Sequence, residues 1–71
     1  MESGTKVILN NAPLYVRYGS RAPIGTKTGE FYIWSVTVAN DRIRVTNKKE
    51  NAGKPGQVVG WINTKDIAIV E

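Results

Sequence analysis

The sequence predicts an all-β domain, a small closed or partly opened barrel of five or six short antiparallel strands. β-branched residues dominate the apolar residues of the chain, which include eight Val and seven Ile but only two Leu. Six Thr are also β-branched. Such side chains lose rotamer freedom in helices and pack well on a pleated sheet. Short apolar runs separated by Gly, Pro and Asn indicate successive strands and turns. Closure would also protect the edge strands of a chain of only 71 residues.

The first third of the chain is expected to hold two short strands and a long loop. Residues 5–9 form the first strand, and the Asn and Pro of residues 10–13 end it in a turn. Residues 14–18 alternate, which places Leu14, Val16 and Tyr18 on one face and Tyr15 and Arg17 on the other. Residues 19–29 contain three glycines and a proline and are predicted to form a surface loop.

The strongest strand signal is residues 30–39, which are apolar on both faces in their first half. This pattern predicts a central strand, or one that bends between two sheets. Asn40 and Asp41 tolerate positive φ and predict a tight hairpin turn into a strand over residues 42–47. In that returning strand two residues are expected to point inward and three outward: Ile43 and Val45 in, and Arg42, Arg44 and Thr46 out.

The last third is expected to begin with an exposed, mobile loop over residues 48–57, which are charged and contain Gly and Pro. Residues 58–63 form the next strand, with Gly60 placed either for a close approach by a neighbouring strand or for a ligand; we favour the strand. Residues 66–70 form a last short strand, or a single helical turn that leads into one.

The composition argues against catalysis. The chain has no Cys and no His, so it lacks a thiolate nucleophile and the usual general base, zinc ligand and triad partner. Of its six acidic residues, only Glu30 and Asp66 are expected in ordered positions, and nothing suggests that they meet. No phosphate-binding loop or metal-ligand spacing is present. We expect a binding module without cofactor or metal.

The chain also lacks membrane and export signals. No apolar run approaches the ~20 residues that a membrane span needs, and residues 1–4 lack the basic and apolar segments of a signal peptide. The net charge of +4 and the pI near 9.7 suit an anionic partner or surface, although such values are also common in small domains.

An ordered series of short motifs resembles bacterial SH3-like domains. Leu-Tyr-Val-Arg at residues 14–17 resembles the element that opens these domains, and Val-Gly-Trp-Ile at residues 59–62 resembles their closing element. Gly-Glu-Phe-Tyr-Ile-Trp at residues 29–34 and Asn-Asp-Arg-Ile-Arg-Val-Thr-Asn at residues 40–47 are similar to segments of a narrower group. That group is the C-terminal wall-binding modules of phage and prophage endolysins, amidases and muramidases that act on Firmicutes. The resemblance covers about residues 6–67.

This resemblance implies an SH3-like β-barrel that binds cell walls and does no chemistry itself. Its ligand would be a peptidoglycan stem peptide or another wall polymer, and its location the bacterial cell wall after release. The catalytic domain of the parent peptidoglycan hydrolase would lie on the N-terminal side, outside this chain. Residues 1–4 are then a linker or a cloning boundary, and residues 5–71 the wall-binding domain.

The candidate ligand-binding residues are mostly aromatic. Six large rings are too many for so small a core, and Tyr15, Trp34 and Trp61 as a set suit a shallow groove that stacks peptide bonds or sugar faces. Arg17 shares the predicted face of Tyr15 and is the preferred partner for a carboxylate. The full set of candidates is Tyr15, Arg17, Tyr18, Tyr32, Trp34, Asn47 and Trp61.

Simpler interpretations of these residues stay open. Tyr32 and Trp61 could plug the ends of the barrel, and Asn47 could bond a loop instead of a ligand. The basic side chains could be no more than a solvated face; they are Arg17, Arg21, Lys27, Arg42 and Arg44.

Two other functions remain as alternatives. Small basic barrels with surface aromatics bind single-stranded nucleic acid, but the charge here is spread over loops instead of forming a stripe. A domain that grips proline-rich peptide is the third possibility. The early loop of eukaryotic adaptor domains is acidic, whereas the one here is basic, which argues against that assignment.

Overall fold

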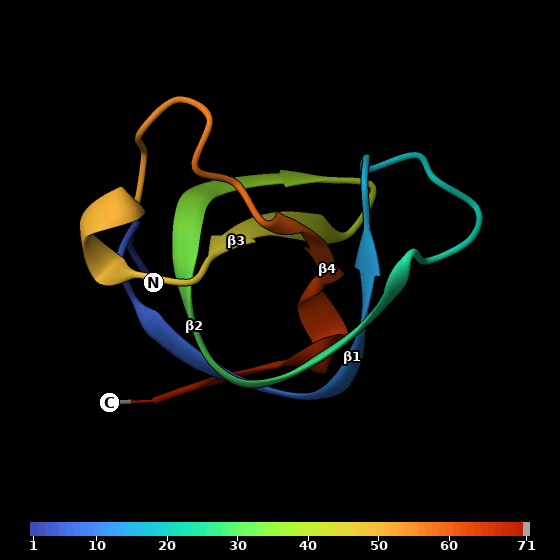
Figure 1. Cartoon of the computed structure of the whole chain (residues 1–71), viewed down its shortest axis with the longest axis horizontal. Coiled ribbons are helices and arrows are strands. Elements are labelled where there is room, and N and C mark those ends of the chain that lie inside the picture. The colour runs from blue at the N-terminus through green and yellow to red at the C-terminus, as the bar shows by residue number, and fades with distance from the viewer. Residues whose placement is uncertain (71) are drawn as a thin grey trace.

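The computed structural model describes residues 1–70 and shows one sheet of five antiparallel strands (Figure 1). The predicted all-β class is confirmed, since this described part contains no α-helix. Two single-turn 3-10 helices accompany the strands, η1 (Lys49–Asn51) and η2 (Thr64–Asp66). The strands are β1 (Lys6–Tyr15), β2 (Gly25–Ala39), β3 (Arg42–Thr46), β4 (Gly60–Asn63) and β5 (Ile67–Ile69).

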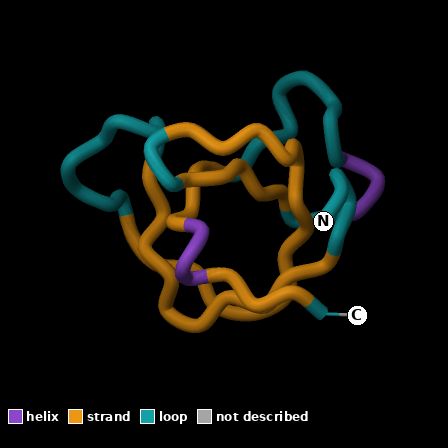
Figure 2. The backbone as a smooth tube through the Cα atoms, turned by 180° about the vertical axis from the view of Figure 1, so that it is seen from behind, coloured by secondary structure: helices purple, strands orange, loops and turns teal. Residues whose placement is uncertain are grey.

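The strand order is β2-β3-β4-β1-β5, and β1 also pairs with β2. Four strands therefore form a closed circuit of hydrogen-bonded neighbours, and β5 is added on the far side of β1. Figure 2 shows these strands running round a common centre, with the long loops projecting from the rim. We call residues 16–24, between β1 and β2, the early loop, and residues 47–59, between β3 and β4, the late loop.

β2 is the strand that two neighbours share. Residues 25–32 pair with β1 and residues 32–39 pair with β3, so that Tyr32 faces both Lys6 and Thr46. Its central position was predicted from the apolar character of both its faces. The surface loop predicted over residues 19–29 is wrong in its second part, because residues 25–29 continue β2 and pair with β1.

β1 is one strand where two were predicted. The turn expected at residues 10–13 is absent, and the register with β2 shifts instead between Leu9 and Ala12. Asn11 takes a φ of 52° there, and its backbone N–H donates to Thr28 Oγ1 at 3.0 Å. The Asn residues therefore form a bulge within the strand. β1 also ends at Tyr15, three residues earlier than predicted.

The predicted hairpin between β2 and β3 is confirmed. Asn40 and Asp41 have φ of 53° and 58°, the two successive positive values that a type I′ turn requires. Ile43 and Val45 point inward and are fully buried, as expected. Thr46 was expected outside but is also fully buried. It lies at the end of β3, opposite the residue where β2 changes partner, and the alternation stops there.

The last third of the chain has the predicted order of a loop and two strands, but both strands are shorter than predicted. The late loop is exposed over residues 53–57, but β4 begins at Gly60, two residues later than expected. η2 leads directly into β5, which is one of the two predicted alternatives, a helical turn before a short strand, although the turn begins two residues earlier than expected.

The core lies inside the circuit of strands and is built mostly from β-branched side chains. Phe31, Val59 and Ile67 pack against its edge. Its eight members are Val7, Leu9, Ala12, Leu14, Ile33, Ile43, Val45 and Ile62. Because alternate residues of each strand fill this interior, the residues between them form an outer surface, on which the candidate site lies.

Candidate functional site

A row of aromatic and cationic side chains crosses the outer face of β2, β3 and β4. Arg44 lies opposite Trp61 in the β3–β4 register. Its guanidinium carbon is 4.6 Å from the ring centroid of Trp34 and 5.0 Å from that of Trp61. Tyr18 packs edge-on against Trp61, with the centroids 5.6 Å apart and the planes at 66°. We call Trp34, Arg44, Trp61 and Tyr18 the aromatic row.

Local strand geometry explains why these four side chains meet. Arg44 stands between the buried Ile43 and Val45, and Trp61 precedes the buried Ile62, so alternation turns both outward. Trp34 follows the buried Ile33 at the point where the register of β2 against β3 shifts. Such an irregularity re-aims a side chain, and this one places the indole beside the Arg44 guanidinium.

The two ends of the aromatic row are attached to the two long loops. Trp34 Nε1 donates a 2.9 Å hydrogen bond to the carbonyl oxygen of Lys54 in the late loop. Tyr18 belongs to the early loop and is 53% exposed. The Nε of Arg44 is buried without a hydrogen-bond partner among residues 1–70. The row therefore offers ring faces and a cation to a ligand lying between the loops.

Arg42, two residues before Arg44, holds the early loop in place. Its guanidinium carbon is 3.5 Å from the ring centroid of Tyr15, and its Nε donates to Asn63 Oδ1 at 3.0 Å. Asn40 Nδ2 adds a 2.9 Å bond to a carbonyl of the same loop. Arg42 Nη1 lies 2.8 to 3.3 Å from three loop carbonyl oxygens, those of Arg17, Tyr18 and Ser20.

The structure brings three of the predicted site residues together, namely Tyr18, Trp34 and Trp61. Tyr15 lies beside them, paired with Trp61 across β1 and β4, but only 9% of it is exposed because Arg42 covers its ring. It supports the site and offers a ligand little surface. Arg17 is exposed, and within the described residues its hydrogen bonds are formed by its backbone N–H and carbonyl oxygen.

Tyr32 and Asn47 lie outside the ring and guanidinium contacts of the aromatic row. Tyr32 is half-buried beside Lys6, which pairs with Glu30. The hydrogen bond from Lys6 to Glu30, reinforced by the carboxylate charge, raises the pKa of Lys6 above its ordinary value. Asn47 is exposed at the start of the late loop. Their positions give no support to a role in the same site.

Arg42 and Arg44 were missing from the predicted site, although a signal for them was present. The alternation of residues 42–46 puts both guanidinium groups on one outer face. What the sequence does not show is which strands lie beside β3, and so which rings the two side chains meet.

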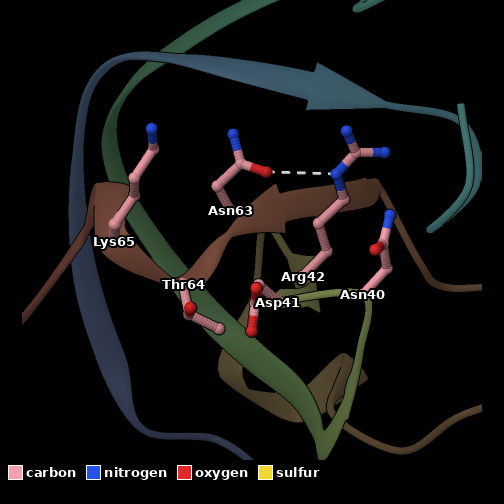
Figure 3. A pocket seen from close by; sticks show the side chains of 6 residues that line it. All are labelled: Asn40, Asp41, Arg42, Asn63, Thr64 and Lys65. Atoms are coloured by element: carbon pink, nitrogen blue, oxygen red, sulfur yellow. Dashed lines mark hydrogen bonds between the residues drawn. The ribbon is translucent and has the colours of Figure 1, made fainter. Parts of the chain in front are cut away.

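Two hollows lie on the surface, one lined in part by Arg42 and one lined by the early loop. The first, about 350 Å³, is drawn in Figure 3 and is lined by Asn40, Asp41, Arg42, Asn63, Thr64 and Lys65. The second, about 410 Å³, is lined by Arg17, Tyr18, Gly19 and Ser20 of the early loop. Tyr18 is the one lining residue that the second hollow shares with the aromatic row.

Comparisons with protein-family models, curated proteins and solved structures found no match to this chain. Within residues 1–70, no three His, Cys, Asp or Glu side chains gather where they could hold a metal ion. The same part of the chain has no helix long and apolar enough to cross a membrane.

Proposed function

We propose that this chain is a non-catalytic module that binds the peptidoglycan of Gram-positive walls and holds a lytic enzyme there. The observation that carries the proposal is the aromatic row, in which the Arg44 guanidinium lies between the rings of Trp34 and Trp61. Indole faces stack on planar peptide bonds or sugar faces, and a guanidinium donates two parallel hydrogen bonds to a carboxylate. A stem peptide with a free carboxylate combines these features.

We further propose that the sheet is an SH3-like barrel. The closed circuit of pairings among β1, β2, β3 and β4 supports this assignment. So does the meeting of the two motifs that resemble the opening and closing elements of bacterial SH3-like domains. They are more than 40 residues apart in the sequence, yet Leu14 pairs with Ile62 and Tyr15 with Trp61.

Within this proposal the carboxylate-binding role belongs to Arg44, and no longer to Arg17. Arg44 is positioned by its neighbours on two strands, whereas Arg17 is exposed on the early loop. A side chain that is already ordered loses less conformational entropy when the ligand binds. The net charge of +4 adds a general attraction to anionic wall polymers.

Co-sedimentation with purified Gram-positive cell walls tests the proposal. The wild-type chain should be found with the walls, and Trp34→Ala and Tyr18→Ala should each weaken the association by at least about tenfold. Val38→Ala is the control, because Val38 is an exposed apolar residue of β2 that makes none of the row's contacts. If the chain sediments with no Firmicute wall preparation at all, the proposal is wrong. It is also wrong if Val38→Ala weakens wall binding as much as Trp34→Ala and Tyr18→Ala do.

The same rings would also stack on nucleic-acid bases, so a single-stranded oligonucleotide belongs in the experiment. Electrostatic binding to such a strand falls steeply as salt is added. Tight, salt-sensitive oligonucleotide binding without wall binding would replace the wall proposal. Selective capture of a proline-rich peptide would instead indicate an adaptor domain.

A further inference from the structure

We infer that the hollow lined by the β2–β3 turn and η2 is a second ligand site, which takes a small zwitterion carrying an ammonium and a carboxylate. The hollow has a volume of about 350 Å³. None of its lining residues belongs to the aromatic row. The inference therefore does not depend on wall binding.

The walls of this hollow are ordered before any ligand arrives. Thr64 N–H donates to the carbonyl oxygen of Asp41 at 2.8 Å, which ties η2 to the hairpin turn. Asn63 accepts from Arg42 through Oδ1, and its Nδ2 donates to Asp66 Oδ2 at 3.2 Å. A site built from groups already fixed in position loses little entropy on binding.

The polar groups of the hollow are separated by charge. In Figure 3 the amine of Lys65, the amide nitrogen of Asn63 and the guanidinium of Arg42 lie along one side. The carboxylate of Asp41 and the side chain of Thr64 lie on the other side. Within residues 1–70, the side chains of Asp41 and Lys65 form no ion pair with each other or with another residue. One negative and one positive group are therefore available to a ligand.

This separation selects the chemistry of the ligand. A ligand ammonium would be bound by Asp41, and a ligand carboxylate by Lys65 and by Arg42. The hydrogen bonds of the Arg42 side chain use Nε and Nη1, so Nη2 is left to donate to the ligand. The lining contains no aromatic ring on which a sugar could stack. The volume is at the small end of ligand sites, which suits a free amino acid or the exposed end of a short peptide.

An NMR titration of the whole chain with glycine and glycylglycine tests the inference. Backbone amide signals of residues 40–42 and 63–65 should shift and saturate, with a Kd on the order of 1 mM for so few contacts. Glycinamide lacks the carboxylate and N-acetylglycine lacks the ammonium, and each should bind about tenfold more weakly. Tighter binding of glycylglycine than of glycine would identify a peptide end as the natural ligand, and the reverse a free amino acid.

Two variants that each remove one charge complete the test. Asp41→Asn keeps a residue that tolerates the φ of 58°, and Lys65→Gln keeps a long polar side chain. Each should weaken glycine or glycylglycine binding about tenfold, while Lys54→Gln on the late loop should not. An unchanged fingerprint spectrum shows that a variant is folded. The inference is wrong if neither zwitterion gives saturable shifts, if the blocked analogues bind equally, or if both variants retain wild-type affinity.

Discussion

Two arginines on the same outer face of β3 have different roles. Arg42 uses its Nη1 and Nε as donors to backbone and amide oxygens and stacks on Tyr15. Arg44 lies between two indole rings, and its buried Nε has no partner in the described part of the chain. A guanidinium suits both environments because it is planar and always charged. At the aromatic row, the first arginine therefore positions the loop that carries Tyr18, and the second is available to a ligand.

Gly60 lies where a neighbouring strand approaches closely, as its place before Trp61 predicts. A Cβ added there would lie 2.6 Å from Leu14 Cδ1 and 2.9 Å from the carbonyl oxygen of Tyr15. The neighbour is therefore β1 and not a ligand, which is the alternative that we favoured. The closeness of β1 to β4 explains why the smallest residue precedes Trp61.

Gly60→Ala should therefore destabilise the protein by about 1–3 kcal/mol, since the added methyl group meets the backbone of β1 as well as a core side chain. Urea unfolding followed by circular dichroism measures this as a lower midpoint. Gly25→Ala is the matched control, because a Cβ at Gly25 meets no atom within 4 Å. Equal midpoints for the two variants would contradict the packing argument.

At the scale of elements, the early loop depends on β3 for its position. Its ends are closed by the bond from Ile24 N–H to the Leu14 carbonyl, at 2.8 Å. Its middle has few packed side chains and is held by Arg42 and Asn40. The hairpin turn and the loop that carries Tyr18 are thus coupled, so the position of Tyr18 in the aromatic row depends on a residue that is not part of the row.

Arg42→Lys should release this loop. An ammonium cannot reproduce the planar fork that reaches three carbonyls and Asn63, so amide hydrogen exchange in residues 16–24 should accelerate. The loss of stability should be about 1–3 kcal/mol. Arg44→Lys is the matched control, with the same substitution on the same strand face, and should leave exchange in the loop unchanged. Similar exchange in both variants would show that Arg42 does not hold the loop.

At the scale of the whole molecule, eight side chains form the core of the described residues 1–70. A domain of this size has a free energy of unfolding of about 4–11 kcal/mol. Most of its strand pairings join distant parts of the sequence, as β1 does with β4 and β5. No strand can therefore keep its place if the common interior is lost.

Ile43→Ala should remove a large part of that stability. Ile43 is a fully buried member of the core, and a cavity of this kind costs about 2–5 kcal/mol. A strong fall in the urea midpoint is expected. Val38→Ala removes apolar atoms from a residue that is 52% exposed and should change stability by less than about 0.5 kcal/mol. Similar urea midpoints for Ile43→Ala and Val38→Ala would show that Ile43 does not belong to the stabilising core.

The sequence by itself determined the β class, the Asn40–Asp41 hairpin, the inward positions of Ile43 and Val45, and the lack of His and Cys. These features depend on composition and on residues close together in the chain, where propensity and alternation act directly. The tertiary structure decided the rest: the single bulged strand β1, the ring of Tyr15 under Arg42, and Arg44 between Trp34 and Trp61. Register between strands distant in sequence depends on the shared core, and local pattern carries no information about it.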